Sequence, residues 1–129
     1  MCVKNCHAAN QQKNPKADKV YAFSGKEYKN STSGGAFHDL AIHLIKEVYI
    51  ICAAKFDESL RLRHDFVTNE HELIKFQRSK HLQSNNMHGI YSKIGNVLKE
   101  GKKLMFVGTP CQVSLLKTYL VIRIAINYF

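Results

Sequence analysis

The cysteine best placed for chemistry is Cys111, in the segment Leu-Met-Phe-Val-Gly-Thr-Pro-Cys-Gln at residues 104–112. The apolar run predicts a short buried strand, Gly-Thr-Pro ends it, and the apolar residues after Gln112 indicate a helix. A thiol between strand and helix lies at the edge of an α/β sheet where ligands bind. A helix N-terminus also favours the thiolate, which is both nucleophile and metal ligand. Free cysteines are equally often inert and buried, so the local pattern leaves both roles open.

The other cysteines suggest metal or redox use more than a disulfide framework. Cys2 and Cys6 form a C-x3-C pair in a polar N-terminal stretch. Two thiols do not complete a structural zinc site or an iron–sulfur cluster, which generally need four ligands. Cys52 lies within an apolar run and is predicted to be an inert core thiol.

Two polar stretches have compositions suited to ligand binding. The first, Asn-Ser-Thr-Ser-Gly-Gly-Ala-Phe at residues 30–37, precedes a helical pattern, and such a turn can cradle phosphate. It is neither a Walker loop nor G-x-G-x-x-G, and a plain helix N-cap explains it as well. The second, Gln-Arg-Ser-Lys-His-Leu-Gln-Ser-Asn-Asn at residues 77–86, has two firm cations and no acid. It suits either an anionic, hydrogen-bonding ligand or a solvated connection.

These stretches are separated by patterns that predict an α/β fold with a mixed, largely parallel sheet flanked by helices. Apolar or alternating runs predict strands at 20–24, 48–54, 60–68 and 104–107. Helical spacing predicts a helix through Phe37 to Ile45, one at 70–76 after an Asn69 cap, one through Ile90 to Leu98 that ends at Gly101, and one at 110–120. The apolar end, 121–129, is β-prone and predicts an edge strand, or the exposed end of a fragment.

Composition indicates a globular chain of 129 residues, with 45% hydrophobic and 22% charged residues. No apolar run is long enough to span a bilayer, and the N-terminus has no apolar signal core, which favours a cytoplasmic protein. The formal charge of +9, from 19 Lys and Arg against 10 Asp and Glu, favours anionic partners. The lysines are dispersed and aromatic residues do not interleave with them, so a nucleic-acid groove is not favoured.

In their order, the Ser-Thr-Ser-Gly-Gly turn, the Ser-Lys-His-Leu-Gln-Ser stretch and Gly-Thr-Pro-Cys-Gln resemble the coenzyme F420 hydrogenase/dehydrogenase beta-subunit family. The resemblance covers roughly residues 19 to 120. It implies an oxidoreductase that passes electrons between a 4Fe-4S cluster, FAD and a deazaflavin (coenzyme F420) or another acceptor. The implied partners are other redox subunits or ferredoxin-like electron carriers.

The resemblance also implies site residues, none of them catalytic in the sense of an acid, base or nucleophile. The implied flavin-binding positions are Ser31, Ser33, Gly34, Gly35, Ser79, Lys80, Gln83, Ser84, Thr109, Pro110 and Gln112. Within the second stretch, His81 and Leu82 replace the usual Tyr-Val. Lys80 would place positive charge beside phosphate or the reduced isoalloxazine. Cys111 corresponds to the cysteine expected to ligate the cluster, and Cys2 and Cys6 to further ligands.

The chain departs from the family at both ends. Cys2 and Cys6 match only the last two cysteines of a C-x2-C-x2-C-x3-C-P run, and His7 replaces its proline. We therefore expect residues 1–18 to be the remnant of a cluster segment and linker. Residues 19–120 would form the flavin-binding domain, and 121–129 a divergent or truncated tail. The chain is expected to be a fragment whose electron path is incomplete.

Two other functions remain open. One is a non-catalytic basic α/β module that binds nucleotide or nucleic acid through the Ser-Gly-Gly turn and the Lys80 loop. The other is a thiol enzyme using Cys111, for which His38, His43 and His81 are candidate general bases by residue type alone.

Overall fold

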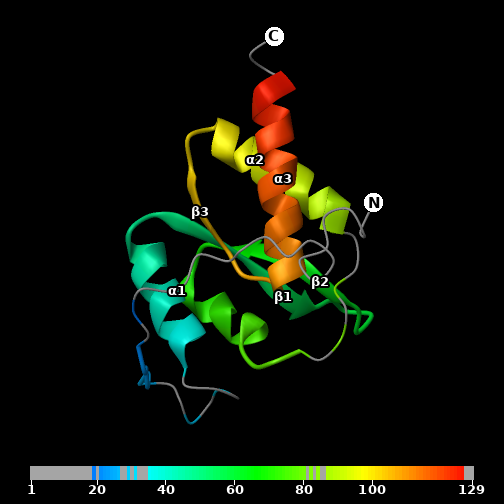
Figure 1. The fold of residues 1–129 in the computed structure, drawn as a ribbon. Coiled ribbons are helices and arrows are strands. Elements are labelled where there is room, and N and C mark those ends of the chain that lie inside the picture. Colours follow the sequence, from blue (N-terminus) through cyan, green and yellow to red (C-terminus); the bar gives the residue numbers. More distant parts are fainter. Residues whose placement is uncertain are drawn as a thin grey trace. The chain divides into compact units, whose positions relative to one another are not determined.

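The computed structural model describes residues 19, 21–26, 29, 31, 35–80, 82, 84 and 87–126, and gives only the backbone at 87, 88 and 123–126. These residues belong to two units, which meet in the sequence between Val107 and Gly108. The unit Ala22–Val107 contains a sheet and three helices, and the other contains the last helix (Figure 1).

The sheet of the unit Ala22–Val107 has three strands in the order β2-β1-β3. The strands are β1 (Tyr49–Phe56), β2 (Leu62–Val67) and β3 (Lys103–Phe106). The central strand β1 pairs antiparallel with β2 and parallel with β3. The predicted α/β class with a mixed sheet is confirmed, with one of the two strand pairings parallel.

Helices cover both faces of this sheet. On one face, α1 (Ala36–Lys46) and the 3-10 helix η2 (Glu70–Phe76) pack against β1. On the other, α2 (Met87–Lys99) packs against β2 and β3. Strand alternation separates the two cores, because Ile51 and Ala53 join the α1 core whereas Cys52, between them, points to the opposite face. The α1 core contains Ala41, Ile51, Ala53, Val67, Leu73 and Phe76.

Local sequence signals set several element ends. The Asn69 side chain accepts a hydrogen bond from Glu72 N at 3.0 Å, so the predicted cap of η2 is confirmed. Gly101, with φ +73°, follows α2 in the left-handed conformation that glycine adopts without strain. At the start of α1 the N-cap residue is Gly35, with φ +77° and no side-chain cap bond.

Two predicted strands are wrong where the structure describes them. Residues 21–24 of the expected strand 20–24 are not in a strand, and Val20 lies outside the described residues. Since β-propensity acts through cross-strand packing, an apolar pentapeptide without a paired neighbour does not form a strand.

The second correction concerns the chain's end. Residues 121–126 belong to α3 (Pro110–Ile126), not to an edge strand, and 127–129 lie outside the described residues. Helix propagation costs far less than nucleation, so a well-started helix continues through the β-branched residues that follow it. No helix in the described part of the chain is both long and apolar enough to cross a bilayer.

The turn between α1 and β1 contains a strained residue, Val48. Its φ is +63°, and its N–H donates to Ile45 O at 3.0 Å, which closes the end of the helix. A β-branched residue is a marked outlier in this region, where glycine is usual. The side chain is 83% exposed, so little packing depends on it.

We expect Val48→Gly to raise the free energy of unfolding by about 1 kcal/mol, because it removes the Cβ that opposes the left-handed conformation. Chemical denaturation measures this change. Val48→Ala is the matched control: it keeps a Cβ and should gain less. Equal or lower stability of the glycine variant would contradict the assigned strain.

Candidate functional site

A single buried imidazole connects three segments of the unit Ala22–Val107. His64 lies on β2 and is 8% exposed. Its Nε2 is 3.0 Å from Val107 O, and its Nδ1 is 2.8 Å from Ser84 Oγ. Since a carbonyl only accepts, Nε2 carries the proton, and Ser84 Oγ donates to the bare Nδ1. Desolvation lowers the pKa of His64, which agrees with a neutral ring.

Aromatic contacts hold this imidazole in place. The ring of His64 stacks on Phe106 at a centroid distance of 5.2 Å and an interplanar angle of 19°. Tyr91, on α2, meets the same phenyl ring edge-on at 6.2 Å. His64 therefore has little rotational freedom, and both ring nitrogens keep their partners.

The position of this link matters because Val107 ends the parallel part of the sheet. Val107 N donates to Cys52 O at 2.8 Å, immediately beyond the last paired residue of β3. In α/β sheets, ligands bind outside the carboxyl ends of parallel strands. Through His64, Ser84 of the second polar stretch is fixed at that edge.

Lys80, in the same stretch, is fixed by the main chain. Its Nζ is 2.9 Å from Phe76 O, 2.6 Å from Gln77 O and 3.1 Å from Arg78 O. Partial burial lowers the pKa of Lys80, whereas the three carbonyl contacts favour its ammonium form. The loop is thus held at two points: Lys80 binds the main chain at the end of η2, and Ser84 binds His64 on β2.

The other predicted residues of this unit are described in part. Gly35 is buried at the start of α1, Ser31 is half-buried and Ser79 is exposed. Ser33, Gly34 and Gln83 lie outside the described residues. A left-handed glycine at a helix start fits a turn that opens main-chain N–H groups toward a ligand, and it fits an ordinary helix entry equally well.

The Thr-Pro-Cys-Gln turn forms a helix cap in the second unit. Gln112 Oε1 accepts from Thr109 N at 2.9 Å, and Val113 N donates to Thr109 O at 3.0 Å. This is half of a capping box, with Pro110 at the first helical position where proline is favoured. Cys111 is exposed, and its Sγ is 3.0 Å from Thr109 Oγ1. The T-x-x-Q spacing of residues 109–112 is a sequence signal for this cap.

The cysteines divide into one accessible thiol and one core thiol within the described chain. Cys52 is fully buried, and burial, with a smaller effect from Asp65, raises the pKa of its thiol to about 12. The predicted core position of Cys52 is therefore confirmed. Cys2 and Cys6 lie outside the described residues, within which no three His, Cys, Asp or Glu side chains gather as a metal site. Cys111 fits one cluster ligand, and the described residues supply no complete set.

Two candidate general bases lie beside acids, His38 without a hydrogen bond from its Nδ1 within the described chain, and the third lies outside the described residues. His38 Nδ1 is 3.5 Å from Asp39 Oδ1, and His43 Nε2 is 3.3 Å from Glu47 Oε1. His81 lies outside the described residues. Each of the two described pairs is a local contact on or just after α1, and both imidazoles belong to the other unit from Cys111.

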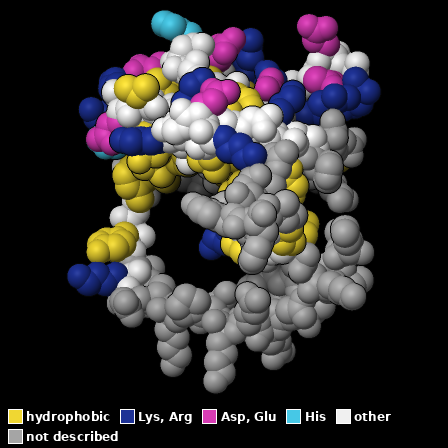
Figure 2. Space-filling model, turned by 90° about the horizontal axis from the view of Figure 1, so that it is seen from above, with side chains coloured by type: hydrophobic (Ala, Val, Ile, Leu, Met, Phe, Trp, Pro, Cys, Tyr) yellow, Lys and Arg dark blue, Asp and Glu magenta, His cyan; other side chains and the backbone are white. Residues whose placement is uncertain are grey.

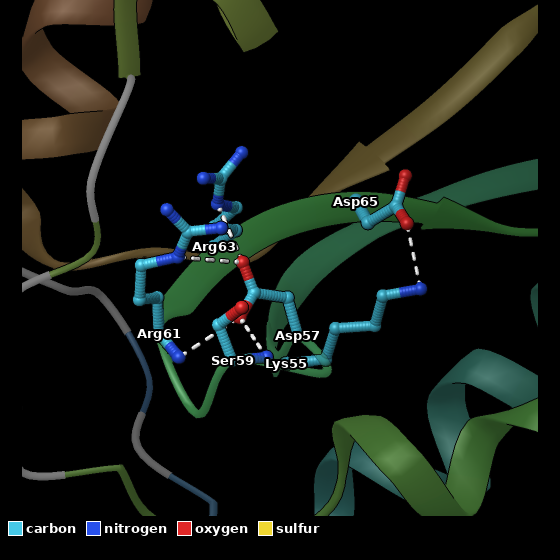
Figure 3. Close-up of polar contacts among 6 residues, drawn as sticks. All are labelled: Lys55, Asp57, Ser59, Arg61, Arg63 and Asp65. Atoms are coloured by element: carbon cyan, nitrogen blue, oxygen red, sulfur yellow. Dashed lines mark hydrogen bonds and ion pairs between the residues drawn. The ribbon is translucent and has the colours of Figure 1, made fainter.

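Charged side chains on the described surface are mixed in sign. Figure 2 shows Lys and Arg beside Asp and Glu over the same face, not a field of one sign. Figure 3 shows the densest group, at the β1–β2 hairpin, where Asp57 Oδ2 meets Arg61 Nε at 3.2 Å and Arg63 Nε at 2.8 Å. Beside it, Lys55 Nζ pairs with Asp65 Oδ2 at 2.6 Å.

The Asp57 carboxylate has a structural explanation. Its Oδ1 accepts from Ser59 N at 2.9 Å and Arg61 N at 3.0 Å, which closes the hairpin loop. The main-chain bond from Arg61 is the largest of several effects that hold the pKa of Asp57 below its usual value, and the two guanidinium groups act in the same direction. We assign this group to hairpin stability, since its three cations all pair with its two carboxylates.

His64 is the residue that the sequence did not single out. The alternation predicted a half-exposed strand with His64 on the same face as Leu62 and Phe66, and gave the histidine no role of its own. Its partners are 20 and 43 residues away in sequence, so no local spacing could indicate them.

Comparison of the chain with protein-family models, curated protein sequences and solved structures finds no match. The family resemblance therefore rests on the three motifs, and the site rests on its own geometry.

We expect Ser84→Ala to lower the free energy of unfolding by about 1–3 kcal/mol, because it leaves the buried Nδ1 of His64 without a donor. Chemical denaturation gives the value. Ser59→Ala is the matched control, since Ser59 is exposed and its N–H contact with Asp57 survives the change. If the two variants were equally stable, the Ser84–His64 hydrogen bond would make no measurable contribution to the free energy of unfolding.

Stability should also fall on acidification through this histidine. The pKa of His64 lies below its ordinary 6.5 in the folded chain. As pH falls below about 6.5, the unfolded chain takes up a proton that the folded chain resists, so the folded state loses stability. His64→Gln keeps an N–H for Val107 O but does not titrate. Urea denaturation across this pH range should therefore show that the free energy of unfolding falls less steeply on acidification in the variant. An equally steep fall in both proteins would contradict the role assigned to His64.

Proposed function

We propose that this chain is a flavin-binding oxidoreductase domain of the coenzyme F420 hydrogenase/dehydrogenase beta-subunit type. It would bind FAD and pass electrons to or from a 4Fe-4S cluster and a deazaflavin or other acceptor. The observation that carries the proposal is the His64 link. It fixes Ser84, from one motif, to Val107 O, immediately before the Gly108 turn of another.

This link supports the proposal because it fixes Ser84, in the second polar stretch, to Val107 at the end of β3. The loop at 77–84 is anchored at the carboxyl end of the parallel strand pair, the usual ligand edge of such a sheet. It presents an exposed Ser79 and the cations Arg78 and Lys80. That set suits a ligand with phosphate groups and several hydrogen-bonding atoms.

A bound flavin would supply hydride exchange and single-electron transfer, chemistry that side chains do not perform. The protein's own residues would bind and orient it. Lys80 holds the loop main chain and adds positive charge to it, and Ser84 holds the loop to the sheet. The glycine turn before α1 would offer main-chain N–H groups to phosphate.

Cys111 is proposed as one cluster ligand. It is exposed at the start of a helix whose cap bond joins Thr109 N to Gln112 Oε1, and its Sγ contacts the Thr109 hydroxyl. Because the described residues supply one ligand, no electron-transfer step is derived through the cluster.

Titration of the chain with FAD, followed by flavin fluorescence and equilibrium dialysis, tests the proposal. We expect saturable binding near one FAD per chain. A chain that binds no FAD, yet binds nucleic acid tightly and in a salt-sensitive way, would instead be a basic binding module.

Anaerobic incubation with iron and sulfide tests the role of Cys111. Any iron–sulfur absorption that the chain acquires should disappear in Cys111→Ser while FAD binding persists. Cys52→Ala is the matched control and should retain both, since its thiol is buried in the core. Equal iron content in Cys111→Ser and the unaltered chain would remove Cys111 from the ligand set.

A further inference from the structure

The loop after η2 contains two cations, Arg78 and Lys80, and the structure distinguishes their roles. The Lys80 ammonium has three N–H groups, and three main-chain carbonyls lie within 3.1 Å of its Nζ. Those carbonyls belong to the last turn of η2 and the residues after it, where main-chain oxygens lack helical partners. All donors of Lys80 are therefore directed at its own loop.

Arg78 adopts a backbone conformation that this arrangement supports. Its φ is +69°, a value that residues with a Cβ rarely adopt. Its carbonyl is one of the three that contact Lys80 Nζ. Non-glycine residues held in this region cluster at ligand-binding segments, where the surrounding structure maintains an unfavourable local geometry.

The Arg78 side chain is exposed, and no carboxylate in the described part of the chain forms an ion pair with it. This contrasts with Arg61 and Arg63, whose Nε atoms both form ion pairs with Asp57 Oδ2. A guanidinium offers five N–H donors in a planar fork that matches two phosphate oxygens at once.

We propose that Arg78 is the residue of this loop that binds the ligand's phosphate or diphosphate, and that Lys80 is a positioning residue that holds Arg78 in place. This rests on the proposed function and refines it, because the sequence assigned the phosphate-facing charge to Lys80. Arg78 recognises the anion directly, whereas Lys80 acts through the main chain of residues 76–78.

The test compares FAD with riboflavin, which has the same ring system without phosphate, on the full chain. Arg78→Met should weaken FAD binding by roughly ten- to a hundredfold, as expected for a lost charged hydrogen-bonding group, and leave riboflavin binding unchanged. The FAD affinity of Arg78→Lys should lie between those of the unaltered chain and Arg78→Met, since lysine keeps the charge and loses the planar fork of donors. Lys75→Met, an exposed cation on η2, is the matched control and should bind FAD normally.

Arg78→Gly separates binding from folding. Glycine adopts positive φ without strain, so this variant should be at least as thermally stable as the unaltered chain while losing FAD affinity. ADP competes with FAD if the site recognises a diphosphate from any nucleotide, and fails to compete if it requires the flavin as well.

Lys80→Met should behave differently from both Arg78 variants. It should lower the Tm, speed amide hydrogen exchange over residues 77–80 and weaken FAD binding. Unchanged exchange would overturn the positioning role. If the unaltered chain binds FAD and Arg78→Met and Arg78→Gly bind it equally well, Arg78 is not the anion contact and the proposed function stands. If the unaltered chain binds no FAD, the proposed function itself fails.

Discussion

The neutral imidazole of His64 is the interaction on which the arrangement of the candidate site depends. A buried ring with a hydrogen-bonding partner on each nitrogen has one proton arrangement that satisfies both. Here Val107 O requires Nε2–H, and Ser84 Oγ then donates to Nδ1. The tautomer and the loop position determine each other, because displacing Ser84 would leave a buried acceptor without a donor. Strand β2, the end of β3 and the loop before α2 are thus coupled through one side chain.

The loop has a second attachment of opposite electrostatic character. Lys80 holds the main chain through a charged group, whereas His64 holds Ser84 through a neutral one. The two attachments are four residues apart, and each uses donors or acceptors that would otherwise be unpaired. A loop fixed in this way can present exposed polar groups in a defined geometry without paying an ordering cost when a ligand arrives. Arg78 and Ser79 are exposed residues beside the Lys80 attachment.

The sequence predicted what depends on local pattern and missed what depends on distant partners. Helical spacing located α1 and α2, and Asn69 marked the start of η2. The wrong strand at 121–126 came from weighing β-branched residues above the helix start that precedes them. His64 was missed because alternation gives a side chain's face but not its partner. The positive φ of Val48 and Arg78 was likewise not predictable, since neither residue type favours that conformation.

The Thr-Pro-Cys-Gln motif shows why a resemblance needs the geometry beside it. Thr109, Pro110 and Gln112 are each accounted for by the start of α3: a capped N–H, a residue suited to the first helical position, and the side chain that makes the cap. Those three identities would be favoured in any protein that starts a helix there. Cys111 is different, because a cap does not require a thiol at the second helical position. Cys52 shows what a packing thiol is like in this chain: fully buried, with its pKa raised to about 12. Cys111 has the opposite exposure, so core packing does not explain it, and its assignment as a cluster ligand rests on the proposed function.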